Sequence, residues 1–385
     1  MEEFASRTHL RSDAGGHPKR YLWTDAFAVC NFIGLQKKDV AVALVSQVHE
    51  VLGKHRDDDP RSGWISGLGE EEGAKNPTRG GLRIGKPMNE RREFEHSDPQ
   101  LEWGQDGQYL HYSTKWIHAL DQTARATSDS SFLHLAFDLA RVSLARFSHS
   151  AGLGDGSKAL YWKMSIDLSY PLVLTMGQHD ALDALITFNH LQATASTHFP
   201  DQQFPDLTSE MSVLEAICEH QGSLASLDPL GIGGLLCDAC KLTLTIIEMK
   251  SCSQSQNSKL LLRILEDSAR SLDVYQMQHS HSFQERASSR LAFRELGLCI
   301  GLHAVSRMRS LVLENPVFQE SDVGKEIEAV LIHLEHFSAL TQLIEEFWST
   351  HYSGVVSANW QEHQDINSVM LATSLAPDGF LMTTS

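Results

Sequence analysis

Residues 103–120, WGQDGQYLHYSTKWIHAL, predict a helix with one aromatic face, and the rest of the chain can be interpreted around it. Asp106 and Gly107 are typical of a turn that starts a helix. The aromatic residues then recur at spacings of three and four, which places them on one side of the helix: Tyr109, Tyr112 and Trp116. Such a stripe either belongs to the core or stacks on a bound ligand, a sugar or an apolar molecule.

A long polar segment, residues 56–105, leads into this helix with many glycines and prolines and little periodicity. A loop of that length inside a compact domain is usually functional or disordered. We predict an ordered rim that carries charged side chains onto the start of the aromatic helix. This arrangement is a common way to line a pocket for a polar small molecule.

Helical periodicity covers most of the remaining chain, with one short extended segment at 159–166. Helices joined by two or three residues lie antiparallel as hairpins. We expect about ten to twelve helices and no substantial sheet. The predicted fold class is all-α, an (α/α)6 toroid of helical hairpins in which residues 1–19 form a flexible arm and 20–385 a single domain.

The composition limits the classes of function. The chain has 385 residues, of which 42% are hydrophobic, and a net charge of −17. This acidity argues against nucleic-acid binding, which needs a concentrated basic surface. No apolar run reaches a membrane span, since the best candidate, 230–249, is interrupted by Asp238 and Lys241. The N-terminus lacks the apolar region of a secretion signal, so we expect a cytoplasmic protein.

Several blocks resemble a largely uncharacterised family within the six-hairpin glycosidase-like superfamily: RYLWTDAFAVCNF (20–32), GLRIGKP (81–87), LEWGQDGQYLHYSTKW (101–116), MGQHDALDALIT (176–187) and HQDINSVMLATSL (363–375). The 106–120 block is also similar to helix starts of N-acylglucosamine 2-epimerase-like proteins. The resemblance implies the (α/α)6 fold, in which an inner ring of helices opens into a sugar-binding funnel. Epimerases of this shape use histidines as acid and base, whereas the glycosidases use paired carboxylates.

The candidate acid/base group is His179 with Asp180 and Asp183, at the start of a predicted helix. A histidine beside a carboxylate can be tuned for proton transfer near neutral pH. Alternatively, the two aspartates are ordinary first-turn acids favoured by the helix dipole. Glu102 and Asp106 could form a catalytic carboxylate pair, although Asp106 is equally suited to cap the aromatic helix.

Charged side chains of the loop could anchor an anionic substrate, since arginine and lysine both bind phosphate or carboxylate. Arg83 and Lys86 are the candidates, and the alternative is a solvated loop whose basic residues balance its glutamates. The predicted binding residues are Arg83, Lys86, Asp106, Tyr109, Tyr112, Trp116, Lys163, Asp183 and His363.

Metal ions and cofactors are not expected, because no phosphate-binding, dinucleotide-binding or zinc-binding motif occurs. Cys237 and Cys240 have the CxxC spacing but no second pair nearby. The expected partner is a small-molecule substrate, with no nucleic acid or membrane, and a homodimer is compatible with the sequence.

The leading functional hypothesis is an enzyme that isomerises, epimerises or cleaves a sugar or similar polyhydroxylated molecule. His179 would act as acid/base, and Asp180 and Glu102 as its carboxylate partners. A second hypothesis is a secondary-metabolism enzyme that cyclises or rearranges an apolar substrate such as a terpenoid, although the chain lacks a DxDD motif. A third is a non-catalytic binding or scaffold protein on the same fold.

Overall fold

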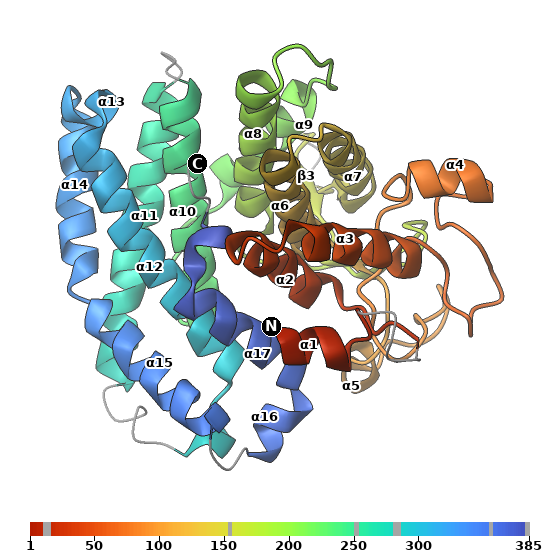
Figure 1. The fold of residues 1–385 in the computed structure, drawn as a ribbon. Coiled ribbons are helices and arrows are strands. Elements are labelled where there is room, and N and C mark those ends of the chain that lie inside the picture. The colour runs from red at the N-terminus through yellow and green to blue at the C-terminus, as the bar shows by residue number, and fades with distance from the viewer. Residues whose placement is uncertain (11–16, 153–155, 250–253, 280–285, 354–356, 382–385) are drawn as a thin grey trace. The chain divides into compact units, whose positions relative to one another are not determined.

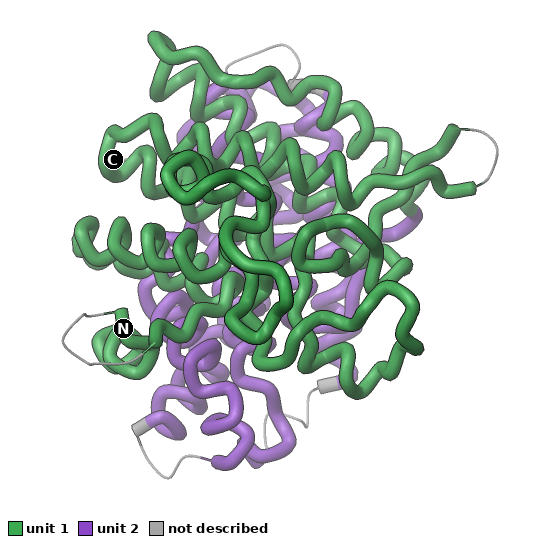
Figure 2. The backbone as a smooth tube through the Cα atoms, turned by 90° about the vertical axis from the view of Figure 1, so that its right-hand side faces the viewer, with its two compact units in different colours: residues 1–221 green, residues 222–385 purple. Residues whose placement is uncertain are grey.

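The computed structural model divides the chain into two compact units, residues 1–221 and 222–385 (Figure 2). The structure describes residues 1–10, 17–152, 156–249, 254–279, 286–353 and 357–381. Each unit has its own buried apolar core and is described by itself.

Unit 1 is built from helices with a few short strands (Figure 1). Its elements are α1 (Glu2–Arg7), α2 (Leu22–Gly34), α3 (Lys38–Leu52), α4 (Glu70–Lys75), α5 (Pro99–Glu102), β1 (Gln108–Tyr109), α6 (Leu110–Thr127), α7 (Ser131–Phe147), β2 (Ser148–Ser150), β3 (Lys158–Leu160), β4 (Lys163–Met164), β5 (Pro171–Val173), α8 (Asp180–His198) and α9 (Thr208–His220).

Three helical hairpins make up most of unit 1: α2 packs on α3, α6 on α7 and α8 on α9. Helices α6 and α8 run in the same direction. His111 near the start of α6 lies beside Asp180 at the start of α8, and Asp121 further along α6 lies beside His190 further along α8. Helix α2 begins at the same place, because Tyr21 just before it hydrogen-bonds Tyr112 of α6. The starts of three helices therefore meet.

A small antiparallel sheet, β1-β4-β5, lies where α6 begins and was not expected from the sequence. Tyr109 of β1 pairs in register with Lys163 of β4. Gly107 precedes β1 with a φ of 148°, and a Cβ there would lie 2.6 Å from the Met164 carbonyl oxygen. The strand can approach β4 so closely only because this residue has no side chain.

Residues 1–19 are predicted to form a flexible arm, but the first of them form a helix. Glu2–Arg7 forms α1, in which Phe4 and Ala5 are buried. A six-residue helix is marginal by itself, so the burial of Phe4 is the physical reason for its order. Residues 11–16 of the predicted arm lie outside the described residues.

Unit 2 continues the pattern of packed helices. Its elements are α10 (Pro229–Met249), α11 (Gln254–His279), α12 (Ala292–Glu314), α13 (Pro316–Gln319), α14 (Asp322–Glu335), α15 (Ser338–Ser353), α16 (Ala358–Glu362), α17 (Gln364–Leu375) and two 3₁₀ turns, Ala287–Ser289 and Pro377–Gly379. Helix α10 packs on α11 and, most extensively, on α12, where Gly233 and Gly301 let the two backbones touch.

Helices α10 and α12 are long and apolar enough to span a membrane. For 230–249, which forms α10, the sequence predicts no membrane span. Most of each helix is nevertheless buried inside the fold. Buried apolar helices of this length also form the cores of soluble proteins, so the structure is compatible with a soluble protein.

The predicted all-α fold class is confirmed, because most of the described chain is helical.

Candidate functional site

The converging helix starts of unit 1 carry a group of aromatic rings, which we call the aromatic cluster. Its members are Tyr21, Trp23, Tyr109, His111, Tyr112 and Trp162. His111 packs nearly parallel to two of these rings, 5.0 Å from Tyr109 and 6.2 Å from Trp162 between centroids. Other rings of the cluster meet edge-on, as His111 does with Tyr112, so the cluster is a packed group of aromatic rings with an imidazole among them.

His111 faces a carboxylate of another helix. Its Nδ1 lies 3.6 Å from Oδ1 of Asp180, and its side chain is 23% exposed against 9% for the aspartate. The Nδ1 atom is buried and makes no hydrogen bond within the described residues. A small movement of the ring would let Nδ1–H donate a hydrogen bond to Asp180. This bond would fix the imidazole tautomer and leave Nε2 as the nitrogen that exchanges a proton.

Asp180 is itself held in place by the turn before α8. Its Oδ2 accepts a hydrogen bond from the Gly177 backbone N–H at 3.2 Å. A Cβ on Gly177 would lie 2.5 Å from the same carboxyl group, so the glycine makes room for it. The block GQHD thus shapes the turn that aims Asp180 at His111.

The sequence analysis assigned the acid/base role to His179 and did not single out His111. His179 occupies the N-cap position of α8, directly before Asp180. The histidine that the fold brings to Asp180 comes from α6, 69 positions away in the chain. The available signal was the histidine in QYLHY, one residue inside a helix start, but its partner could not be named without the packing of α6 against α8.

Phenol groups of the cluster are kept neutral. Burial, reinforced by neighbouring Tyr21 and the carboxylate of Glu102, raises the pKa of Tyr109 above its usual value. Burial likewise raises the pKa of Tyr112, whose hydroxyl lies 2.8 Å from that of Tyr21. These tyrosines therefore remain hydrogen-bond donors at physiological pH.

Behind Tyr109 the predicted residues Glu102 and Lys163 form a buried ion pair. Lys163 Nζ donates to Glu102 Oε1 at 2.7 Å, and to the backbone oxygens of Glu102 at 3.0 Å and Gln105 at 2.9 Å. The other oxygen of Glu102 accepts from Arg91 Nε at 3.4 Å. Glu102 is thus a carboxylate bonded to two cations, and all three ammonium protons of Lys163 have acceptors.

Asp106 and Arg83 are also brought together, in a network that holds the loop against the helix start. Asp106 Oδ2 accepts from Arg83 Nη1 at 3.0 Å, and its Oδ1 accepts from the backbone N–H of Gly85 at 2.9 Å. Asp106 does not cap α6, whose N-cap residue is Tyr109, because β1 intervenes. Arg83 makes two further bonds, to the carbonyl oxygens of Val51 and Lys54, so each of its three guanidinium nitrogens has an acceptor within the protein.

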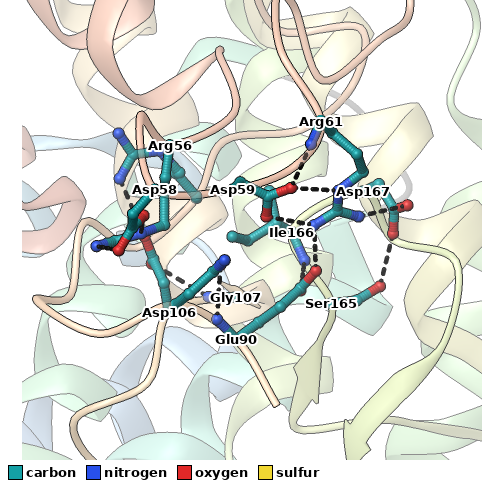
Figure 3. A network of polar contacts seen from close by, with 12 residues as sticks. Arg56, Asp58, Asp59, Arg61, Glu90, Asp106, Gly107, Ser165, Ile166 and Asp167 are labelled. Carbon is teal, nitrogen blue, oxygen red and sulfur yellow. Dashed lines mark hydrogen bonds and ion pairs between the residues drawn. The ribbon is translucent and has the colours of Figure 1, made fainter. Parts of the chain in front are cut away.

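The polar segment 56–105, which we call the rim segment, carries a second ionic network around Arg61 (Figure 3). The Arg61 guanidinium contacts Asp59, Glu90 and Asp167. Glu90 in turn accepts from the Ile166 backbone N–H. These contacts tie the loop to the β4–β5 connection, far away in sequence.

Lys86 differs from these cations. Its side chain is buried, its ammonium donates to the Trp103 carbonyl oxygen, and it lies 5.5 Å and 5.6 Å from the ring centroids of Trp103 and Tyr109. Burial, reinforced by the charge of Lys163, lowers the pKa of Lys86 to about 8.

The remaining predicted residues are not members of the aromatic cluster. Trp116 is fully buried, and its indole N–H donates to His49 Nε2 at 3.1 Å. Burial lowers the pKa of His49 to about 3, so this histidine is a neutral acceptor. Asp183 is buried and accepts from Lys115 and Thr114, at 2.8 Å and 2.5 Å. His363 belongs to unit 2, where its ring lies 5.8 Å from that of Phe293.

Each unit also contains a cleft. One of about 730 Å³ lies beside the rim segment in unit 1, with Lys54, His55 and Arg61 in its wall. The other, of about 570 Å³, lies between α12 and α15 in unit 2 and contains a pair of His303 with Glu345 at 2.9 Å. Within the described residues, no group of three or more acidic, histidine or cysteine side chains is placed to hold a metal ion.

The chain matches no protein-family model, no curated protein and no solved structure. What the protein does is therefore inferred from the chemistry of these side chains.

Proposed function

We propose that the protein is an enzyme that moves a proton on a sugar or similar polyhydroxylated small molecule, by isomerisation or epimerisation. The observation that carries the proposal is the pair of His111 and Asp180 beside the rings of Tyr109 and Trp162. His111 is the acid/base, Asp180 orients it, and the neutral phenol of Tyr109 supplies a hydrogen-bond donor. In this proposal the hairpins close into an (α/α)6 ring whose funnel opens at these helix starts.

The charged groups favour this function over rearrangement of an apolar substrate. A terpenoid cyclase would require a lining of apolar groups, whereas Lys86, His111 and Asp180 surround the aromatic rings. Cleavage of a glycosidic bond requires a protonated carboxylic acid. The two carboxylate oxygens of Glu102 instead accept hydrogen bonds from Lys163 and Arg91.

The test begins with a thermal-shift screen of the whole chain against free hexoses, hexosamines, hexose phosphates, hexuronates and prenyl diphosphates with Mg²⁺. A ligand of the native state raises the melting temperature. Each stabilising compound is then incubated in D₂O and followed by NMR for deuterium incorporation next to the carbonyl carbon. Stabilisation by prenyl diphosphates alone would favour the terpenoid function instead.

We expect His111→Gln to lower the rate of deuterium incorporation by about 10²- to 10⁴-fold while ligand binding persists. Asp180→Asn should lower it by about ten- to a hundredfold, because it disturbs only the orientation of the imidazole. His179→Gln is the matched control and should keep most of the activity. A loss of activity in His179→Gln with normal turnover in His111→Gln would show that the acid/base residue is His179.

A further inference from the structure

The cations near the aromatic cluster differ in how completely the protein satisfies them. Arg83 uses Nε, Nη1 and Nη2 on two carbonyl oxygens and Asp106. Lys163 donates to three oxygens of Glu102 and Gln105. Arg91 is bonded to Glu102 and to the carbonyl oxygens of Glu95 and Leu172. Each of these three side chains is bonded to a carboxylate and to backbone carbonyl oxygens, and these bonds hold the loop and the sheet together.

Lys86 has one acceptor, the Trp103 carbonyl oxygen, and no ion-pair partner within the described residues. Its side chain is more than nine-tenths buried. An ammonium group has three protons to donate, so two of them make no hydrogen bond to the described residues, and the ammonium lies over the rings of Trp103 and Tyr109. A buried charge without a counterion is costly, and proteins usually pair it.

The carboxylates whose charges act on Lys86 are Asp106 and Glu102. Asp106 is bonded to Arg83, Arg56 and the Gly85 and Gly107 amides. Glu102 is bonded to Lys163 and Arg91. Both carboxylates therefore already serve other cations of the site.

From these contacts we infer that the substrate of this site carries an anionic group, a carboxylate or a phosphate, and that Lys86 binds it. The inference rests on the proposed function and names its substrate class as sugar acids or sugar phosphates. Trp103, 64% exposed and edge-on to Trp162 at 5.8 Å, lies over the ammonium and forms the outer wall of this subsite.

The binding experiment uses isothermal titration of the full chain with D-glucuronate, D-glucose 6-phosphate and D-glucose at pH 7. We expect the two anions to bind and Lys86→Met to weaken each by about ten- to a hundredfold, the usual contribution of a charge-assisted hydrogen bond. Lys75→Met is the matched control, because it removes the same charge from an exposed side chain that pairs with Glu71. It should leave the affinities unchanged.

The pH dependence provides a second readout. Lys86 has a pKa of about 8 and is charged below it, so the affinity for glucuronate should be about twofold lower at pH 8 than at pH 6.5 and fall about tenfold for each further pH unit. The groups that act on Lys86 are Lys163, Asp106, Glu102 and the ring of Tyr109. The glucuronate carboxylate does not titrate in this range. Lys86→Arg, which stays charged, should retain binding at pH 9.5.

The outcomes separate this inference from the proposed function. Equal affinity for glucose and glucose 6-phosphate, or normal anion binding by Lys86→Met, would overturn the anionic-substrate inference and leave the acid/base proposal standing. Binding of the anions without any proton exchange that depends on His111 would overturn the acid/base proposal and leave Lys86 as the anion-binding residue. No binding by any of the three compounds would overturn both. Unchanged circular dichroism spectra check that each variant is folded.

Discussion

Lys163→Met is expected to lower the free energy of unfolding by about 3 kcal/mol. The ammonium of Lys163 is fully buried and holds Glu102, whose side chain is 9% exposed. Methionine fills nearly the same volume, so the cost comes from the carboxylate left without its nearest counterion. This loss of free energy lies at the lower end of the range for breaking a buried ion pair, because Arg91 still contacts Glu102. Urea unfolding followed by circular dichroism measures it.

Two further variants isolate the charge effect for this buried pair. The exposed pair of Lys75 and Glu71 should contribute less than about 1 kcal/mol, so Lys75→Met serves as the matched control. The double variant Lys163→Met with Glu102→Met should recover part of the lost stability, because no buried carboxylate remains. If the double variant were less stable than the sum of the two single changes predicts, the buried-charge explanation would be wrong.

Gly233→Ala is expected to destabilise unit 2 by about 1–3 kcal/mol, although alanine is the better helix former. A Cβ at this position of α10 would lie 2.0 Å from the Gly297 carbonyl oxygen of α12. The obstacle is backbone rather than a side chain, so no rotamer change relieves it and the two helices must move apart. Thermal and urea unfolding of the full chain provide the measurement.

The neighbouring glycine of the same helix provides the control. A Cβ on Gly234 would meet nothing within 4 Å, and the residue lies inside α10. Gly234→Ala should therefore stabilise the protein by about 0.5–1 kcal/mol, the usual gain from replacing a glycine in a helix. Changes of the same sign in both variants would show that α10 and α12 do not cross as closely as described.

The helical character of the chain was evident from local patterns. Apolar residues at spacings of three and four predicted helices over most of the chain, and α7 and α10 are two of the helices that form. This signal is strong because each helix must bury one continuous face, whichever neighbour covers it. The strands of the β1-β4-β5 sheet are two or three residues long, too short to show an alternating pattern.

Candidate-site residues could be proposed by type and position, but their partners could not. Glu102 and Lys163 were both expected to line a pocket, yet their pairing follows from the register of β1 with β4. Arg83 and Lys86 were indistinguishable as cations of one loop. Only the folded chain shows how their contacts differ. Arg83 makes three hydrogen bonds, one of them to a carboxylate, whereas Lys86 makes one hydrogen bond, to a carbonyl oxygen.

The sequence by itself determined that the protein is helical, that a long polar segment leads into an aromatic helix, and that Asp180 stands at a helix start. Tertiary structure alone decided that this carboxylate lies beside His111 of another helix. The physical reason is that helical periodicity is a property of neighbouring residues, written along the chain. Which side chains face each other depends on how helices pack across dozens of residues, and α6 against α8 is one solution among many that the same pattern allows.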